Sequence, residues 1–331
     1  MNLDLLSIGD VNLDVFVNPS ESESLCNLNT KECLIAFSYA DKIPVKSLDF
    51  SIGGNAANNA VGVTRLGVKT SLVLTLGDDS IGNQIIDKLR QEGVDLTYCI
   101  QQPSTLSNFN VVLSYSGERT IFTYHAPRSY EFPVQLPKTP WAYLTSMGES
   151  YEPFYNHIVE WLIKNPEVKL AFNPGSWQLK AGVDGISKIL KLTNIIFVNK
   201  QEAEKLTGLK AKDVVNKELL TALSGLGPKI SVITDGERGS YMYDGQKFLN
   251  CPPLPVDAYE RTGAGDAFGS GFLSALIKNK TVDECLIWGT VNSASVIGYI
   301  GAQKGLLKES DMDVWVARFK SSGVEVEEMQ S

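Results

Sequence analysis

Two glycine-rich segments, about 200 residues apart, contain the residues whose types and spacing best suit chemistry. The later one reads "RTGAGDAFGSGF" (261–272) and places Gly263, Ala264 and Gly265 directly before Asp266. Apolar residues follow at helical spacing, so a helix is expected to start here. Backbone N–H groups at a helix start bind anions, because the helix dipole is positive there. The segment predicts an anion site, with Asp266 either as a helix cap or as a functional carboxylate.

The earlier segment, "SIGGNAANNAVGVTRLG" (51–67), also leads from a strand-like run into a helix. Gly53 and Gly54 would let a ligand approach the backbone closely. Asn55, Asn58 and Asn59 supply amides that both donate and accept hydrogen bonds, which suits hydroxyl groups. A tight turn with helix caps is the alternative, but three Asn in one helix are unfavourable for helix propensity alone. We therefore favour ligand contact.

A third polar cluster, "GDVNLD" (9–14), follows the first strand-like run. Asn12 and Asp14 are two residues apart, so on an extended chain they share a face and can bind neighbouring hydroxyl groups. Taken alone, the cluster is more typical of a plain turn than of a binding site. So many amides and carboxylates, with few apolar residues beside them, indicate a polyhydroxylated substrate.

The elements that must position these residues alternate between β and α. Runs that are apolar on nearly every residue predict strands covered on both faces, at 3–9, 70–77, 141–148, 168–175, 194–199 and 229–236. Helical patterns lie between them, at 55–66, 81–92, 154–164, 182–191, 200–207 and 212–224, and the last third is mostly helical. The alternation predicts a doubly wound α/β fold with a mostly parallel sheet, whose ligands bind beyond the carboxyl ends of the strands.

Two regions lack the helix that would complete a βαβ unit. Residues 11–50 hold alternating polar and apolar pieces, and residues 108–125 indicate a hairpin that turns at Ser116 and Gly117. We expect a small β-sheet lid made of residues 11–50 and 106–125, on a core of residues 1–10, 51–105 and 126–331. A simple extension of the main sheet is the alternative. "YMYDGQKFLN" (241–250) predicts a further hairpin.

Composition excludes several classes of function. The 331 residues carry a net charge of -8 and a pI near 5.0, which argues against nucleic-acid and anionic-membrane surfaces. Five cysteines without a C-x2-C pair, and only two histidines, make a His/Cys metal centre improbable and suggest reduced thiols. With no signal-peptide pattern and no apolar run of about eighteen residues, we expect a cytoplasmic protein.

Taken together, these residues resemble the ribokinase-like (phosphofructokinase-B type) carbohydrate kinase family. "GGNAANNAVGVTRLG" is similar to its first signature and "TGAGDAFGSGF" to its second. The resemblance extends to "GDVNLD", to "NKQEAE" (199–204), to "TDGERGSY" (234–241) and to "GAQ" (301–303), in the family's order along nearly the whole chain. A Rossmann dehydrogenase is excluded, because no G-x-G-x-x-G follows the first strand.

The resemblance implies roles for individual residues. Asp266 would be the general base that takes a proton from the acceptor hydroxyl. The amides of Gly263, Ala264 and Gly265 would form the anion hole for the transferred phosphoryl group. The remaining residues fall into three groups: Asn199 and Glu202 for Mg²⁺, through water, and the phosphates; Thr234, Gly236, Gly239 and Asn292 for ATP; and Asn12, Asp14, Gly54 and Asn58 for the sugar.

The chain departs from the family pattern just before the expected base. Where the family commonly has Asp followed by Thr or Pro, this chain has Glu260 and Arg261. The family carboxylate belongs to a monovalent-cation site, so K⁺ dependence is uncertain. Both a K⁺ bound through the longer Glu260 and a fixed charge supplied by Arg261 stay open. Arg119 and Arg128 are candidates for an acidic or phosphorylated sugar, with ordinary surface or ion-paired arginines as the equal alternative, and Glu149 is another possible sugar contact.

The sequence therefore predicts ATP-dependent phosphorylation of a hydroxymethyl group on a small sugar or sugar acid. A nucleoside kinase of the same fold is the first alternative. A non-catalytic sugar or nucleotide sensor is the second, which intact Asp266 and Glu202 disfavour. Neither nucleic acid nor a membrane is expected as a partner. The resemblance also implies a possible homodimer through the lid.

Overall fold

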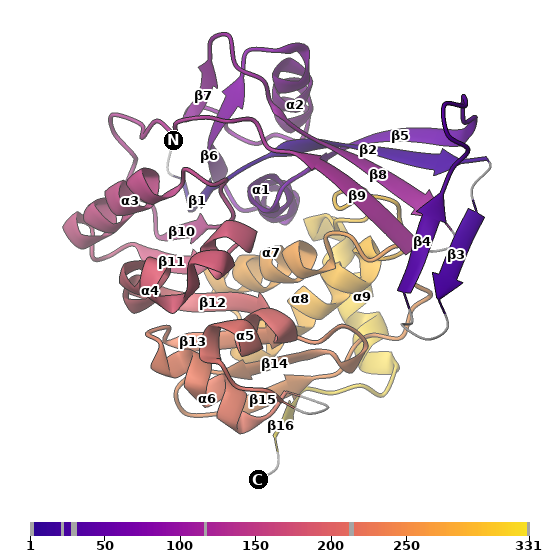
Figure 1. Cartoon of the computed structure of the whole chain (residues 1–331). Coiled ribbons are helices and arrows are strands. Elements are labelled where there is room, and N and C mark those ends of the chain that lie inside the picture. Colours follow the sequence, from indigo (N-terminus) through magenta and orange to yellow (C-terminus); the bar gives the residue numbers. More distant parts are fainter. Residues whose placement is uncertain (1–2, 21–22, 28–31, 116–117, 212–214, 330–331) are drawn as a thin grey trace.

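A large, mostly parallel β-sheet forms the centre of the molecule (Figure 1). The computed structural model describes residues 3–20, 23–27, 32–115, 118–211 and 215–329. Within them, ten strands run in the order β16-β15-β14-β13-β12-β11-β10-β1-β6-β7. Their bounds are β1 (Leu5–Ile8), β6 (Thr70–Gly77), β7 (Cys99–Gln102), β10 (Trp141–Leu144), β11 (Lys169–Phe172), β12 (Thr193–Asn199), β13 (Ile230–Thr234), β14 (Ser240–Tyr243), β15 (Phe248–Cys251) and β16 (Glu327–Glu328).

Pairing is parallel from β7 to β13 and antiparallel from β13 to β16. The central strands β1, β6 and β10 are buried along their whole length, as continuous apolar runs require of strands covered on both faces. The predicted doubly wound fold is confirmed. The hairpin predicted at 241–250 is formed by β14 and β15.

Helices cover both faces of this sheet (Figure 1). One face packs against α3 (Glu152–Lys164), α4 (Ser176–Leu192), α5 (Lys200–Thr207) and α6 (Lys217–Gly225). The other packs against α1 (Asn55–Arg65), α2 (Ser80–Gln91), α7 (Ala264–Ile277), α8 (Val282–Val296) and α9 (Glu309–Ser321). The helix predicted at 212–224 is shorter than expected: α6 begins after Asn216, whose side chain caps it, and residues 212–214 lie outside the described residues.

A second, separate sheet projects from the main body, with strand order β5-β2-β8-β9 (Figure 1). We call it the small sheet. Its strands are β2 (Asn12–Pro19), β5 (Val45–Gly53), β8 (Asn108–Tyr115) and β9 (Glu118–Tyr124). The predicted turn at Ser116 and Gly117 lies outside the described residues, but β8 and β9 pair as a hairpin on either side of it. Beyond the small sheet lies a hairpin of β3 (Glu23–Asn27) and β4 (Glu32–Ala36).

The two faces of the small sheet differ, because side chains alternate along each strand. One face carries the polar residues Asn12, Asp14 and Asn110. The other is apolar: Leu13 and Val15 on this face are buried, whereas Phe50 and Phe122 are each about 60% exposed. No helix long and apolar enough to span a membrane occurs in the described part of the chain.

The first strand of the main sheet passes almost directly into the small sheet. β1 ends at Ile8 and β2 begins at Asn12. Between them, Asp10 is buried, and its Oδ2 accepts hydrogen bonds from the Tyr130 hydroxyl (2.6 Å) and the Gly148 N–H (2.9 Å). The carboxyl edge of the main sheet and the polar face of the small sheet therefore meet at this short connection.

Candidate active site

Helix α7 begins at the glycine-rich turn, as predicted. Gly263 precedes the helix in the left-handed conformation (φ 77°), and a Cβ there would lie 2.3 Å from the Cβ of Ala302. Both constraints exclude a side chain at this position. Gly265, in the first turn, faces open space. The first N–H groups of a helix have no partner within it. This turn therefore offers the open, positively polarised helix end that an anion site needs.

Asp266 lies in the first turn of α7 and contacts the earlier glycine-rich segment, although 208 residues separate it from Asn58. Asn58 Nδ2 donates to Asp266 Oδ2 at 2.8 Å. Burial raises the Asp266 pKa from 3.8 to about 6, and hydrogen bonds from Asn58 and Asn55 limit the rise. The carboxylate is therefore ionised at neutral pH but close to its pKa, which is the state that suits a general base.

The carboxyl ends of the parallel strands bring further amides to this place. Asn173, just after β11, accepts at Oδ1 from Asn55 Nδ2 (3.1 Å) and from the Tyr143 hydroxyl (3.3 Å), and its own Nδ2 donates to the carbonyl of Phe197. Sequence reasoning did not assign Asn173 or Asn110 to the site. The signal available was the position of Asn173 at the end of an apolar run, where ligands of parallel sheets bind.

Asn12 and Asp14 share the polar face of the small sheet, as their spacing predicts. Asp14 Oδ1 accepts from Asn12 Nδ2 (2.5 Å) and from Asn110 Nδ2 on β8 (2.8 Å). Burial raises the Asp14 pKa to about 6; the Asn110 hydrogen bond lowers it, and nearby Glu260 raises it. Gly53 lies against this carboxylate so closely that a Cβ would meet Asp14 Oδ2 at 2.2 Å.

A pocket of about 150 Å³ opens beside the start of α7. Three of its residues were expected at a nucleotide, namely Thr234 at the end of β13 and the glycines Gly236 and Gly239 that follow it. Ala264 and Gly265, at the start of α7, also line it. Its remaining lining is largely apolar and comes mainly from α7, α8 and the segment after β15: Ser240, Pro253, Leu254, Phe268, Thr290, Ser293, Ala294 and Ile297.

The structure does not place Asn292 at this pocket, which corrects the expected nucleotide contact. Its side chain is fully buried, donates to the Ala267 carbonyl (2.8 Å) and accepts from the Leu307 N–H (2.9 Å). The neighbouring Ser293 lines the pocket instead. The side chain of Asn292 therefore joins α8 to α7 and to the segment before α9.

Asn199 and Glu202 form a reciprocal cap at the start of α5. Asn199 Oδ1 accepts from the Glu202 N–H, and Glu202 Oε2 accepts from the Asn199 N–H, both at 2.9 Å. Burial raises the Glu202 pKa, and the nearby Asp266 carboxylate raises it further. Glu202 and Asp266 thus lie close enough for their charges to interact.

Arg119 and Glu260 form an ion pair rather than two independent sites. Glu260 Oε1 accepts from Arg119 Nη1 and from the Thr262 N–H, both at 2.8 Å, and also from the Thr262 hydroxyl. Its Oε2 accepts from the Gly301 N–H (3.2 Å). Four donors, one of them a guanidinium, surround this carboxylate. These residues do not suit a monovalent cation at Glu260.

Arg128 and Glu149 do not join this cluster. Arg128 Nη2 donates to the Leu106 carbonyl and the Asn108 side chain, both at 3.1 Å, and its Nη1 donates to the Thr75 carbonyl. These contacts give Arg128 a structural role, which favours the second of the two alternatives left open by the sequence. Glu149 is exposed directly after Gly148.

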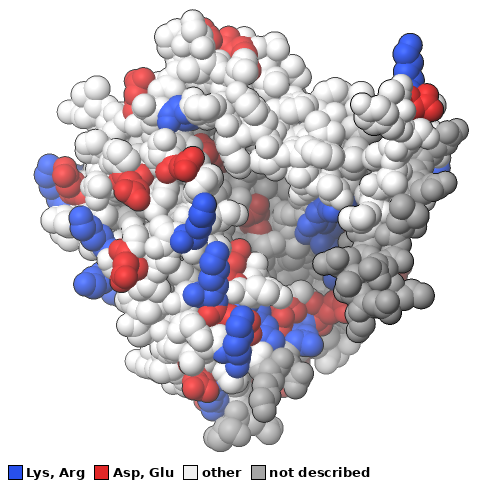
Figure 2. Space-filling model, viewed as in Figure 1, with Lys and Arg blue, Asp and Glu red and all other residues white. Residues whose placement is uncertain are grey.

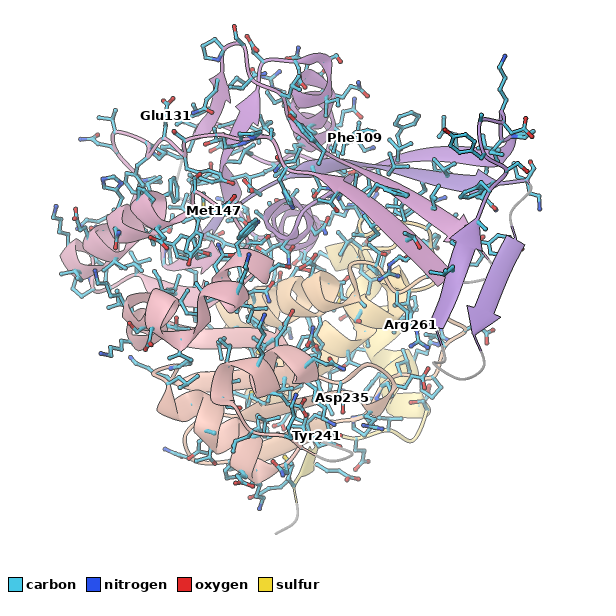
Figure 3. All side chains as sticks on the ribbon, in the orientation of Figure 1. Phe109, Glu131, Met147, Asp235, Tyr241 and Arg261 are labelled. Carbon is cyan, nitrogen blue, oxygen red and sulfur yellow. The ribbon has the colours of Figure 1, made fainter. Side chains whose placement is uncertain are left out.

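A cavity of about 840 Å³ lies between the polar face of the small sheet and the loop before α7. Figure 2 shows the surface hollowed between the main body and the small sheet, and Figure 3 places Arg261 on the loop that faces the sheet. The lining mixes both charges, from Asp49, Arg119, Glu260 and Arg261, with the aromatic side chains of Phe16, Tyr115 and Tyr259. Arg261 forms an ion pair with Glu237.

The fold and this site define an α/β kinase of the ribokinase-like class. A family model described as "pfkB family carbohydrate kinase" matches residues 26–309, well over half of the chain. The chain therefore belongs to the pfkB family of carbohydrate kinases, which are phosphotransferases that act on alcohol groups.

Individual relatives differ in substrate. The chain is 29% identical over 281 residues to an ATP-dependent 6-phosphofructokinase of Thermoanaerobacterium thermosaccharolyticum, covering 81% of this chain and 86% of that protein. It is 26% identical over 270 residues to a nucleoside kinase of Methanocaldococcus jannaschii, covering 77% and 82%. Arabidopsis thaliana ribokinase, solved with ribose and ATP, has the same fold, with a TM-score of 0.78 at 20% identity over 96% of this chain and 99% of that one.

Proposed function

We propose that this kinase transfers the γ-phosphoryl group of ATP to a hydroxymethyl group of a small sugar or sugar acid, with Asp266 as the general base. The position of Asp266 carries the proposal. It lies at the helix end that also forms part of the pocket, and it contacts Asn58 from the other glycine-rich segment. The acceptor hydroxyl would thus meet both a base and an anion site at one place.

We assign ATP to the pocket beside α7. Its apolar residues, Leu254, Phe268 and Ile297 among them, suit a purine base. The N–H group of Gly265, in the first turn of α7, would then face the phosphates and stabilise charge that develops on the transferred group. The Ala264 N–H donates to the Arg261 carbonyl at 3.3 Å, so it would have to exchange this bond for one to the phosphates. Arabidopsis ribokinase, whose structure contains ATP, supports a nucleotide in this fold.

The acceptor would bind between Asp266 and the small sheet. Asn12, Asp14 and Asn58 offer carboxylate and amide groups to hydroxyls. Gly54, the other proposed sugar contact, has φ 91° and packs so closely against the segment before β2 that a Cβ would lie 2.6 Å from the Asp10 carbonyl oxygen. Asp266 would accept the proton of the attacking hydroxyl, and its pKa near 6 keeps it ionised to do so. Glu149 stays a proposed contact at the outer rim.

Mg²⁺ fits the residues near Glu202. Carboxylate and amide oxygens are the ligands it prefers, and Glu202 lies close to Asp266. Among the described residues, no three His, Cys, Asp or Glu side chains form a group that could hold a metal ion. Water and phosphate oxygens would therefore complete the coordination shell of Mg²⁺ near Glu202. Bound Mg²⁺ would neutralise charge on the phosphates. Asn199 orients Glu202 for this task through the reciprocal cap.

One observation favours a nucleoside as the alternative acceptor. The large cavity has the aromatic side chains of Phe16, Tyr115 and Tyr259 in its lining, and a nucleoside needs such a surface for its base. A nucleoside kinase is also among the relatives. A panel of ribose, fructose, 2-keto-3-deoxygluconate, adenosine, guanosine and cytidine would separate the two acceptor classes.

The test of the mechanism is Asp266→Asn. We expect this variant to fold and to bind ATP as the wild type does, with turnover reduced at least about a hundredfold, since general-base catalysis contributes about 10²–10⁴-fold. Retained turnover would refute Asp266 as the base. If the wild type binds ligands but consumes ATP with none of the panel, a non-catalytic sensor becomes the better proposal.

We further propose that the small sheet acts as a lid and that its apolar outer face binds a second copy of the chain. Phe50 and Phe122 are each about 60% exposed, and Leu48 and Tyr124 extend the same face. An exposed apolar patch on the face of a sheet favours association with another protein surface. A cytoplasmic location is proposed because the reaction consumes ATP and because Cys99, Cys251 and Cys285 are free thiols.

A further inference from the structure

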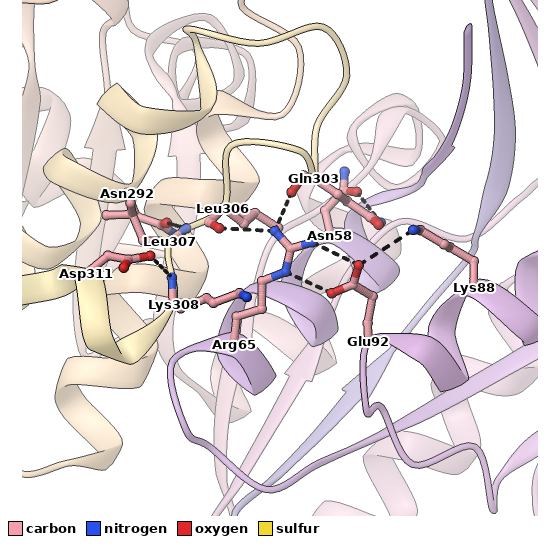
Figure 4. A network of polar contacts seen from close by, with 10 residues as sticks. All are labelled: Asn58, Arg65, Lys88, Glu92, Asn292, Gln303, Leu306, Leu307, Lys308 and Asp311. Atoms are coloured by element: carbon pink, nitrogen blue, oxygen red, sulfur yellow. Dashed lines mark hydrogen bonds and ion pairs between the residues drawn. The ribbon is translucent and has the colours of Figure 1, made fainter.

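Helix α1 holds the loop that contains Gln303 at two points on one face of the helix (Figure 4). Arg65 Nη1 donates to the backbone carbonyls of Gln303 (2.7 Å) and Leu306 (3.0 Å). Asn58, seven residues earlier, accepts at Oδ1 from Gln303 Nε2 at 3.0 Å. Seven residues make about two helical turns, so Arg65 and Asn58 project towards the same loop.

Arg65, which holds this loop, is itself fixed by Glu92. The Nε and Nη2 atoms of Arg65 donate to the two carboxylate oxygens of Glu92, at 2.8 and 2.9 Å. This bidentate pairing fixes the plane of the guanidinium group. At the other end of the loop, Asn292 accepts from the Leu307 N–H (Figure 4). Asn292 also donates to the carbonyl of Ala267, the residue after Asp266. The backbone around Gln303 is therefore fixed relative to both α1 and α7.

The hydrogen bond from Gln303 decides which end of the Asn58 amide faces Asp266. An ionised carboxylate only accepts hydrogen bonds, so Asn58 must turn its NH2 group towards Asp266. Its carbonyl then needs a donor on the opposite side, and Gln303 Nε2 supplies it. Asn58 and Gln303 are 4% and 5% exposed, so bulk water does not readily replace either partner.

We propose that Gln303 is a positioning residue for phosphoryl transfer, which holds Asn58 in the orientation that stabilises ionised Asp266. The inference rests on the proposed role of Asp266 as the general base. Gln303 does not touch the reacting atoms. It acts through Asn58, and Arg65 places it by holding its backbone.

The groups around Asp266 determine how this role can be measured. The charge of Glu202 on α5 interacts with Asp266, and so would that of ionised Tyr143 on β10. Burial disfavours the ionised carboxylate of Asp266, whereas the hydrogen bonds from Asn58 and Asn55 favour it. Weakening the bond from Asn58 should therefore raise the pH at which Asp266 loses its proton.

The first variant is Gln303→Met, which has similar volume but cannot donate a hydrogen bond. We expect kcat to fall about tenfold and the acidic limb of the kcat–pH profile to move up by about one pH unit, since a hydrogen bond to a charged group is worth about one to two pKa units. The KM for ATP should stay unchanged. Circular dichroism and thermal unfolding establish that the variant folds.

A double-mutant cycle then separates positioning from general structural damage. In an Asn58→Ala background, Gln303→Met should lower kcat no further, because the side chain through which it acts is gone. An unshifted acidic limb in Gln303→Met, or a loss of kcat that persists undiminished in the Asn58→Ala background, would overturn the proposal. Turnover retained by Asp266→Asn would instead refute the base itself, so the two failures are distinguishable.

Discussion

Arg119 on β9 and Glu260 before α7 form an ion pair, with 2.8 Å between Nη1 and Oε1, that joins the small sheet to the loop of the anion site. Glu260 also accepts from the Thr262 N–H, directly before Gly263. The Glu260 carboxylate thus contacts both the small sheet, which we propose is a lid, and the turn before α7, which would stabilise the transferred phosphoryl group.

Loss of this ion pair should weaken acceptor binding more than chemistry. The Arg119 side chain is 39% exposed, so the pair contributes modestly, and Arg119→Ala should raise the acceptor KM about two- to fivefold. Steady-state kinetics at low and high salt measure the effect, which salt should diminish. Glu260→Gln also weakens the contacts to Thr262, so its kcat should fall as well. Equal effects of both variants on kcat would contradict this division.

Activity should depend on pH through Asp266. Because the base must be ionised and its pKa is about 6, kcat/KM should rise with pH through about 6 and level off above 7. Asp14, with a pKa also about 6, titrates in the same range, so the profile reports both groups. The Asp14→Asn variant separates them: its acidic limb should persist if Asp266 is responsible.

Asp266 should cost stability at neutral pH. Its folded-state pKa lies above the unfolded value. The contribution of Asp266 to the free energy of unfolding is therefore fully present below pH 3.8 and is lost as pH rises through about 6. The shift from 3.8 to about 6 corresponds to a loss of about 3 kcal/mol at pH 8. Asp266→Asn avoids this loss, so its unfolding free energy should exceed that of the wild type at pH 8 and approach it near pH 4. If Asp266→Asn were more stable than the wild type by the same amount at every pH, the raised pKa of Asp266 would not be the cause.

Two glycines of α7 provide a matched pair. A Cβ at Gly271 would lie 2.5 Å from the Trp288 carbonyl oxygen on α8, whereas a Cβ at Gly269 would meet nothing closer than 3.9 Å. Gly271→Ala should therefore lower the melting temperature by several degrees, because the helices must separate. Gly269→Ala should be neutral or stabilising, since Ala favours a helix interior.

The proposed second copy on the small sheet can be tested by its size in solution. Phe122→Asp should convert a dimer into a monomer, measured by analytical ultracentrifugation, because it places a charge on the apolar face. Ile163→Asp is the control, since Ile163 is similarly exposed (64%, against 60% for Phe122) but lies on α3. A wild type that is monomeric at high concentration would refute the proposal.

The sequence predicts most of the fold because the buried strands are continuous apolar runs. The burial of β1, β6 and β10 follows from local composition alone. Helix ends were less predictable. The sequence predicted a helix at 182–191, whereas α4 already starts at Ser176. The backbone of Gly182 is not helical, so this break separates the first turns of α4 from the part that was predicted.

Side-chain partners could not be predicted where they come from distant segments. Spacing placed Asn12 and Asp14 on one face, but nothing local indicated that Asn110 would complete the group. Arg119 and Glu260 are 141 residues apart, so their charges looked independent. The family resemblance implied that Asn292 contacts ATP, and sequence alone does not reveal that its side chain is buried between α7 and α8.

The short connection from β1 to β2 has a mechanical consequence. Asp10 is held by Tyr130 and Gly148, and only Val11 separates it from Asn12. The hinge about which the small sheet would rotate is thus directly adjacent to Asn12 and Asp14, the side chains that would bind the acceptor. If the sheet rotates, Asn12 and Asp14 must move with it. Binding of the acceptor and closure of the sheet over it would then be one motion.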